Sequence, residues 1–284
     1  MPFSRKVDPI EGKTCSFYLS AVKLNHKILG AGEPLVVLHG LFGMLDNWQT
    51  VARELAKSRM VVLVDLRNHG KSPHHPQHDY PSMAADLAAF LSDNWMHQVD
   101  LLGHSMGGKV AMQFAVSYPG RVRKLIVVDM TPRAYPGGHE EILRAMAEVP
   151  VATGDSAKTS TLSRKQIDEQ LAVRIEEPGV RQFLLKNLRR ERSGGYAWKM
   201  NLAALALEYP KVLAAITGEP WNGAALFVRG GRSRYVRDED WVQVTALFPS
   251  ARLETIADAG HWVHAEAPAA LIALVEGFLG EESV

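Results

Sequence analysis

The chain has 284 residues, a formal net charge of +1 and a hydrophobic content of 46%. This length and apolar content suit one large domain with a sizeable core and room for an insertion. The nearly balanced charge excludes a strong attraction to nucleic acid or to an anionic membrane surface. No apolar run approaches the ~20 residues that a membrane helix needs. We therefore expect neither a nucleic-acid partner nor a membrane span.

Cysteine usage and the N-terminal composition suggest a cellular compartment. Cys15 is the single cysteine, so it cannot form an internal disulfide, which favours a reducing environment. Residues 1–9 carry charges but lack the apolar core of a signal peptide. We expect a cytoplasmic protein.

Short apolar runs alternate with helix-like segments through most of the chain. A hairpin of two edge strands is expected over residues 15–19 and 22–29. Buried strands are expected over residues 35–38, 61–64, 99–102, 125–128, 224–228 and 252–256. Helices are expected over residues 48–56, 83–95, 109–117 and 268–279. Strands that are apolar throughout are covered on both faces, so the pattern predicts an α/β fold with a mostly parallel, twisted sheet flanked by helices.

The alternation breaks between residues 131 and 220. This stretch favours helices over residues 140–148, 163–175, 180–190 and 198–207. A helical block inserted between two strands predicts a lid over the sheet's C-terminal edge. We therefore expect a core domain of residues 1–131 and 221–284, and a helical cap of residues 132–220.

The pentapeptide Gly103-His104-Ser105-Met106-Gly107 lies between a predicted strand and a predicted helix. This is the context of a nucleophile elbow, in which a sharp turn exposes a serine hydroxyl. The two glycines leave room for the backbone that packs across the turn. The sequence therefore predicts that Ser105 is a nucleophile.

A serine hydroxyl needs a base within hydrogen-bond distance, and the base needs an orienting acid. His261 fits the base, because it follows the last predicted strand in a loop before the final helix. Asp129 is the preferred acid, because it ends the strand expected beside the elbow strand. Asp238 is the alternative acid, although Asp is also common at the start of a helix, where Asp238 lies.

An oxyanion hole requires backbone N–H groups that point at the developing negative charge. The N–H of Met106, directly after the nucleophile, is the first candidate. The second comes from the loop after residues 35–38, where Leu41 is preferred and Phe42 is the alternative. His39 is expected to shape this loop through a local hydrogen bond.

Cofactor signatures are lacking in the sequence. It contains neither a phosphate-binding loop nor a dinucleotide-binding glycine pattern. His69, His74, His75 and His78 lie close together but lack the spacing and the thiolate company of metal ligands. We expect no metal and no cofactor.

Five segments spread along the chain carry a resemblance to a known family. They are His39-Gly40-Leu41-Phe42-Gly43, Asp46-Asn47-Trp48, Asp65-Leu66-Arg67-Asn68-His69-Gly70, Gly103-His104-Ser105-Met106-Gly107-Gly108-Lys109 and Gly260-His261-Trp262-Val263-His264-Ala265-Glu266. With them, nearly the whole chain resembles the α/β-hydrolase superfamily and, within it, the YbfF-type esterases. The resemblance implies an α/β-hydrolase fold that cleaves carboxylic esters or acyl thioesters without a cofactor.

The same resemblance bears on the site. It implies an acid after the strand that precedes the lid, which matches Asp129. It also implies an auxiliary serine in the loop after residues 224–228, where Ser233 lies. Arg234 departs from the family, in which a proline is common in that loop.

The sequence thus predicts a serine hydrolase that acts on a small-molecule acyl ester or thioester through an acyl-enzyme, as a monomer or small homo-oligomer. Other chemistry on the same triad stays open: C–C bond hydrolysis, perhydrolysis or acyl transfer to an acceptor other than water. A catalytically silent binding protein on this fold is the second alternative.

Overall fold

The computed structural model describes residues 21–153, 162–192 and 194–281. The expected first strand, residues 15–19, and Cys15 lie outside the described residues. Within the described part, no helix is long and apolar enough to cross a membrane.

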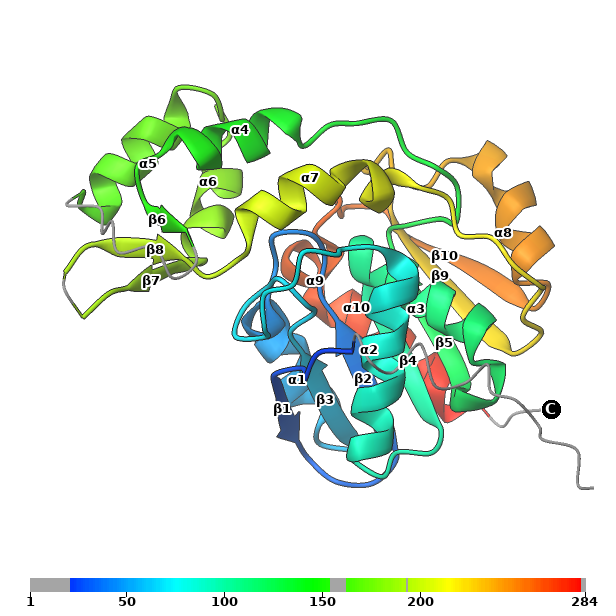
Figure 1. The fold of residues 1–284 in the computed structure, drawn as a ribbon. Helices are drawn as coiled ribbons and strands as arrows, with labels where there is room; N and C mark the ends of the chain where they lie inside the picture. Colours follow the sequence, from blue (N-terminus) through cyan, green and yellow to red (C-terminus); the bar gives the residue numbers. More distant parts are fainter. Residues whose placement is uncertain (1–20, 154–161, 193, 282–284) are drawn as a thin grey trace, which may run out of the picture.

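A seven-stranded sheet forms the centre of the molecule (Figure 1). Its order is β1-β3-β2-β4-β5-β9-β10, and every neighbouring pair is parallel except β1 with β3. The strands are β1 (His26–Leu29), β2 (Pro34–Leu38), β3 (Met60–Val64), β4 (Val99–His104), β5 (Val122–Val128), β9 (Ala224–Gly230) and β10 (Ala251–Ile256). The mostly parallel sheet and the pairing of β5 with β4 confirm the sequence predictions.

Helices cover both faces of this sheet. They are α1 (Gln49–Leu55), α2 (Tyr80–Asp93), α3 (Met106–Ser117), α8 (Trp241–Leu247), α9 (Val263–Glu266) and α10 (Pro268–Gly280). Short 3-10 helices precede α1 and α8, at η2 (Leu45–Trp48) and η4 (Asp238–Asp240), and a third, η3 (Pro119–Arg121), follows α3.

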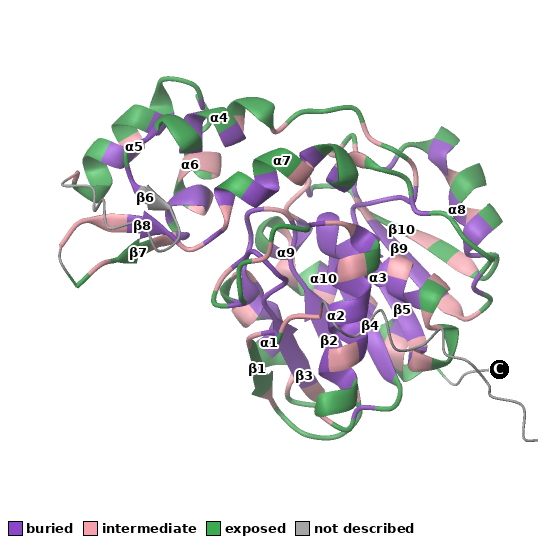
Figure 2. Ribbon diagram, viewed as in Figure 1, coloured by how far each residue is buried: buried purple, intermediate pink, exposed green. Residues whose placement is uncertain are grey.

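Alternate residues of the strands point to opposite faces of the sheet and pack into two separate hydrophobic cores. Val36 and Val62 pack with α2 and α3 on one face. Leu35 and Val61 pack with α1 and α10 on the other. Figure 2 shows the resulting pattern, with the central strands buried between helices and the edge strand β1 exposed. The sheet is therefore a rigid platform for the loops at its edge.

The segment between β5 and β9 differs in part from the sequence prediction. Its helices are α4 (Glu140–Glu148), α5 (Arg164–Ala172), α6 (Pro178–Leu185) and α7 (Leu202–Leu213). It also contains a three-stranded sheet of β6 (Ala152–Thr153), β7 (Leu188–Arg190) and β8 (Tyr196–Trp198). The helix expected over residues 180–190 therefore ends early, and the one expected from residue 198 begins later. These elements lie over the C-terminal edge of the large sheet (Figure 1).

Candidate active site

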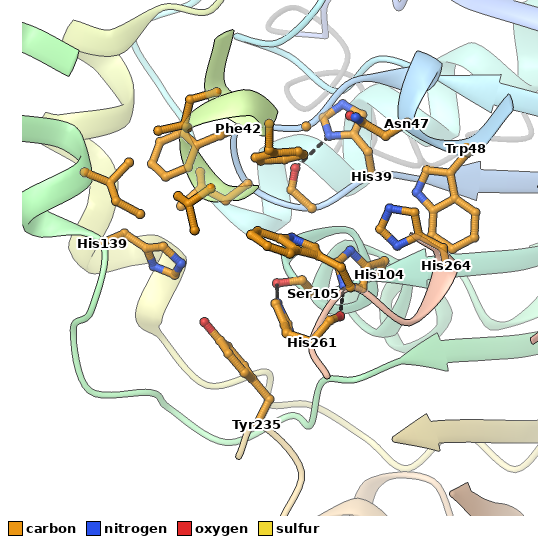
Figure 3. Close-up of a pocket in the computed structure, with 18 of the residues that line it drawn as sticks. His39, Phe42, Asn47, Trp48, His104, Ser105, His139, Tyr235, His261 and His264 are labelled. Atoms are coloured by element: carbon orange, nitrogen blue, oxygen red, sulfur yellow. Dashed lines mark hydrogen bonds between the residues drawn. The ribbon is translucent and has the colours of Figure 1, made fainter. Parts of the chain in front are cut away.

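Loops at the carboxyl ends of the strands bring the predicted site residues together (Figure 3). Ser105 follows β4, Asp129 follows β5, and Ser233 lies in the loop after β9. His261 lies between β10 and α9, and His39 follows β2. Parallel strands end at one edge of the sheet, so residues that are far apart in sequence become neighbours there.

Ser105 lies on the turn between β4 and α3 in a strained conformation. Its φ is 53° and its ψ is −121°, a region that residues with a Cβ rarely adopt unless the surrounding structure holds them there. A Cβ on Gly103 would lie 2.1 Å from the carbonyl oxygen of Gly107. A Cβ on Gly107 would lie 2.5 Å from the carbonyl oxygen of His39. Only glycine fits these two positions, so the turn can be tight enough to present the serine side chain.

His261 connects the serine to a carboxylate. Its Nε2 lies 3.0 Å from Ser105 Oγ, and its Nδ1 lies 2.7 Å from Asp129 Oδ2. In a neutral imidazole with the proton on Nδ1, the ring donates to Asp129 and leaves the Nε2 lone pair for the serine hydroxyl. The three side chains thus form one chain of hydrogen bonds from hydroxyl to imidazole to carboxylate.

Asp129 is fully buried and is held by several donors. Its Oδ1 accepts a 3.0 Å hydrogen bond from Gly230 N–H, and its Oδ2 also accepts from Ser233 Oγ. Its backbone has a φ of 51°, and its N–H donates to Val228 O at 2.7 Å. These contacts fix the carboxylate and aim Oδ2 at the imidazole. Ser233, the expected auxiliary residue, contacts this carboxylate.

The alternative acid lies elsewhere. The Asp238 side chain is 87% exposed and pairs with the Arg229 guanidinium at the start of η4. Of the two predicted acids, the structure brings Asp129 to His261.

Two backbone N–H groups beside Ser105 are available for an oxyanion. Met106 is the first residue of α3, where a helix leaves its N–H groups without intrahelical partners. No hydrogen bond among the described residues occupies the N–H of Leu41. The N–H of Phe42, by contrast, donates to His69 Nε2 at 3.2 Å. This bond leaves Leu41 and Met106 as the free pair.

Buried neutral histidines support the site. Burial lowers the pKa of His39, whose Nδ1 bonds to Gly40 O at 2.8 Å and whose Nε2 accepts from Leu66 N–H at 3.0 Å. His39 therefore shapes its loop, as expected. Burial also lowers the pKa of His69 well below its usual value. His69 holds the Phe42 N–H, a role that the sequence did not reveal.

Two further residues at His261 have roles that sequence reasoning missed. The Nε2 of His104 lies 2.8 Å from the His261 carbonyl oxygen. Burial, together with the neighbouring His261 and His264, lowers the pKa of His104 well below its usual value, so a neutral ring donates this bond. Tyr235 stacks on the His261 ring, with centroids 3.8 Å apart and planes 15° apart. For His104, its position within the elbow pentapeptide was a sequence signal that pointed to the site. For Tyr235, the sequence carried no such signal.

His264 makes no hydrogen bond with Glu266 among the described residues. Its ring stacks on Trp48 with centroids 4.6 Å apart (Figure 3), and burial lowers its pKa to about 4. Glu266 instead accepts from the backbone N–H groups of Gly260 and Trp262. Glu266 therefore orders the loop that carries His261.

Two cavities meet at Ser105. One of about 380 Å³ is lined by His261 and is called the His261 cavity. The other, of about 250 Å³, is lined by Met106 and is called the Met106 cavity. Both are lined by Ser105, Leu41, His139 and Tyr235. The serine hydroxyl therefore faces two compartments.

The charge of Lys109 is buried in the wall of the Met106 cavity. Its Nζ donates to the carbonyl oxygens of Arg133 (2.7 Å) and Ala214. No carboxylate among the described residues pairs with it, and burial, aided by Arg133, lowers its pKa to about 7.

The described residues hold no group of three or more His, Cys, Asp or Glu that could bind a metal ion.

Comparison with known proteins identifies the family of the chain. A family model described as "alpha/beta hydrolase fold" matches residues 33–268. Esterase YbfF of Escherichia coli (strain K12) is 36% identical over 250 residues, which cover 88% of this chain and 94% of that protein. An sn-1-specific diacylglycerol lipase ABHD11 of Danio rerio is 38% identical over 269 residues, covering 92% of this chain and 83% of that protein.

A solved structure extends the comparison to three dimensions. It is described as a marine microorganism esterase, and it matches with a TM-score of 0.86 at 38% identity, covering 91% of this chain and 100% of that one. The family match spans most of the chain and includes the strands and loops that carry the site. The chain therefore belongs to the α/β-hydrolase fold family, and within it to the YbfF-like carboxylic ester hydrolases.

Proposed function

We propose that the protein hydrolyses carboxylic esters and acyl thioesters through a Ser105-His261-Asp129 triad and an acyl-enzyme. The observation that carries the proposal is the continuous hydrogen-bond chain from Ser105 Oγ through His261 to Asp129. Nucleophile, base and orienting acid occur in the order in which a serine hydrolase uses them.

In the first step Ser105 Oγ attacks the carbonyl carbon while its proton passes to His261 Nε2. The carbonyl electron pair moves onto oxygen, which the N–H groups of Leu41 and Met106 stabilise. When the tetrahedral intermediate collapses, the bond to the leaving group breaks and His261 donates the proton to that group. Asp129 stabilises the imidazolium but does not take its proton.

In the second step a water molecule attacks the acyl-enzyme. His261 accepts a proton from the water, and the released acid leaves as the proton returns to Ser105 Oγ. An imidazolium can protonate both a departing alkoxide and a departing thiolate, which leave as the alcohol and the thiol, so the same residues serve esters and thioesters. We also propose that residues 132–220 act as a cap that shields the acyl-enzyme and lines the substrate cavities.

The test is fluorophosphonate labelling combined with ester hydrolysis. Wild-type protein should gain one covalent adduct on the peptide that contains Ser105 and should lose activity in proportion. Ser105→Ala should neither label nor hydrolyse an ester while keeping its thermal unfolding midpoint. Hydrolysis that survives in a folded Ser105→Ala variant would move the nucleophile elsewhere. Labelling without any ester or thioester turnover would favour acyl transfer to another acceptor.

A further inference from the structure

The walls of the two cavities divide the catalytic groups between them. His261 lines the His261 cavity and not the Met106 cavity. Met106, whose N–H is one of the two proposed oxyanion donors, lines the Met106 cavity and not the other. Leu41, which carries the second donor, lines both, as does Ser105. A substrate whose carbonyl carbon contacts Ser105 Oγ therefore has one compartment on each side.

The tetrahedral intermediate has four substituents, and three have fixed places. One is Ser105 Oγ, and the second is the oxyanion beside the N–H groups of Leu41 and Met106. The third is the leaving oxygen or sulfur, which must approach His261 Nε2 to receive its proton. The carbon of the acyl chain takes the fourth direction, away from the imidazole. The Met106 cavity is the one that His261 does not line.

We propose that the His261 cavity binds the leaving alcohol or thiol and that the Met106 cavity binds the acyl chain. This assignment rests on the proposed function, because it uses the role of His261 as the proton donor to the leaving group. Tyr235 and His139 line both cavities.

The chemistry of the two walls then defines the substrate class. The His261 cavity is the larger, at about 380 Å³, and carries the apolar side chains of Ile142, Val180, Phe183, Leu184 and Trp262. The Met106 cavity, about 250 Å³, combines apolar side chains with Lys109, Arg133 and Arg234. Arg133 forms an ion pair with Asp240 at 3.0 Å, and the same carboxylate also pairs with Arg237. The esters that fit join an apolar leaving group of considerable size to a smaller acyl chain.

A matched pair of variants separates the compartments. Val180, near the start of α6, lines only the His261 cavity, and Leu213, the last residue of α7, lines only the Met106 cavity. Both side chains are partly buried, and neither belongs to the triad or the oxyanion hole. Val180→Trp should fill the leaving-group compartment, and Leu213→Trp should fill the acyl compartment.

The assay uses two series of esters. In the first series acetates carry alcohols from methyl to octyl, and in the second ethyl esters carry acyl chains from acetyl to octanoyl. Val180→Trp should lower kcat/KM about tenfold or more for long alcohols and leave the acyl series nearly unchanged. Leu213→Trp should do the reverse. Deacylation, measured after the burst with a p-nitrophenyl ester, should slow only in Leu213→Trp, because the alcohol has already left at that stage.

Exchanged effects, with Val180→Trp discriminating acyl chains and Leu213→Trp discriminating alcohols, would overturn the assignment. So would equal effects of each variant on both series. If either tryptophan prevents folding, Val180→Phe and Leu213→Phe provide the same comparison with a smaller side chain. Failure of the proposed function itself would look different, because the wild-type protein would then show no burst and no acyl group on Ser105.

Discussion

Two residues of the site adopt left-handed backbone conformations that side chains with a Cβ seldom accept. Ser105 has a φ of 53° and Asp129 a φ of 51°. Such a conformation costs on the order of 1–3 kcal/mol and persists only where neighbouring contacts hold it. Around Asp129 these contacts are the hydrogen bonds with Val228, Gly230 and Ser233. The strain places the carboxylate and the hydroxyl on either side of His261.

Replacing the carboxylate of Asp129 tests its role at the imidazole. Asp129→Asn should lower kcat by on the order of 10⁴, because an amide does not hold His261 in the tautomer that leaves Nε2 free. Asp238→Asn is the matched control: it should stay within about twofold of the wild type, as exposed positions away from the site usually do. The measurement is steady-state ester hydrolysis, with circular dichroism to confirm folding. A large loss in Asp238→Asn with little loss in Asp129→Asn would reverse the assignment.

His104 should act as a positioning residue for the loop that carries His261. His104→Phe keeps a ring in the space but removes the donor to the His261 carbonyl oxygen. A buried carbonyl without its partner costs about 1–3 kcal/mol, so kcat should fall about tenfold or more. His264→Phe is the control. The His264 ring contacts the His104 ring, but among the described residues it makes no hydrogen bond to His261. Equal kcat values for the two variants would contradict this role.

At the scale of elements, the connections into and out of the β5–β9 segment are pinned together. Tyr135 N–H donates to Leu213 O at 2.9 Å, and Ile216 N–H donates to Pro132 O at 2.8 Å. Lys109 Nζ, on the helix that begins directly after Ser105, donates to one carbonyl oxygen on each connection. Hydrogen bonds therefore join the nucleophile helix to both connections.

The pH dependence of stability should report on Lys109. Burial lowers its pKa from 10.5 to about 7 in the folded protein. Between these two values the unfolded chain holds the proton and the folded protein has lost it, so the free energy of unfolding rises with pH. Below about pH 7 both states are protonated, and this contribution is constant. Lys109→Met lacks this titrating group. Between about pH 7 and 10.5 the free energy of unfolding of the wild type should therefore rise by on the order of a few kcal/mol relative to that of Lys109→Met.

Urea unfolding at several pH values measures this difference. Lys165→Met is the control, because that lysine side chain is 87% exposed, and it should keep the wild-type trend. A wild-type-minus-Lys109→Met difference that stays constant with pH would show that the buried ammonium does not titrate as expected.

The elements of the central sheet were predictable because their sequence signal is local. A strand such as β3, buried from Val61 to Val64, reads as a continuous apolar run. The small sheet of the β5–β9 segment gave no such signal. β7 and β8 have three residues each, and β7 (Leu188–Arg190) lies where the sequence predicted the end of a helix. Short strands are fixed by their neighbours, which a single sequence does not reveal.

Across the whole molecule, the central sheet and the segment between β5 and β9 should differ in local stability. Every residue of β4 is buried, whereas Ile167 and Leu171 are the buried residues of α5. Elements with few buried contacts open with lower free energies than core strands. Amide hydrogen exchange should therefore be faster in α5 than in β4 and β5. Equal protection of α5 and β4 would contradict this difference.

The candidate site was predictable to the extent that the α/β topology determines it. Loops after parallel strands meet at one edge, so Ser105 and His261 could be paired from their order in the chain. The choice between Asp129 and Asp238 needed the three-dimensional structure, because Asp238 follows β9, which neighbours both β5 and β10. What separates the two acids is that the Asp238 side chain is exposed and paired with Arg229. The stacking of Tyr235 and the division between two cavities depend on side-chain packing across long separations in sequence, which no local pattern encodes.

During turnover Ser105 should carry the acyl group of the substrate. Rapid acid quench of the protein with a p-nitrophenyl ester, followed by peptide mass measurement, detects this intermediate. We expect one acyl group on the peptide containing Ser105, formed within the burst and lost at the rate of deacylation. An acyl group on another residue, or turnover of the ester with no acylated peptide at any quench time, would contradict it.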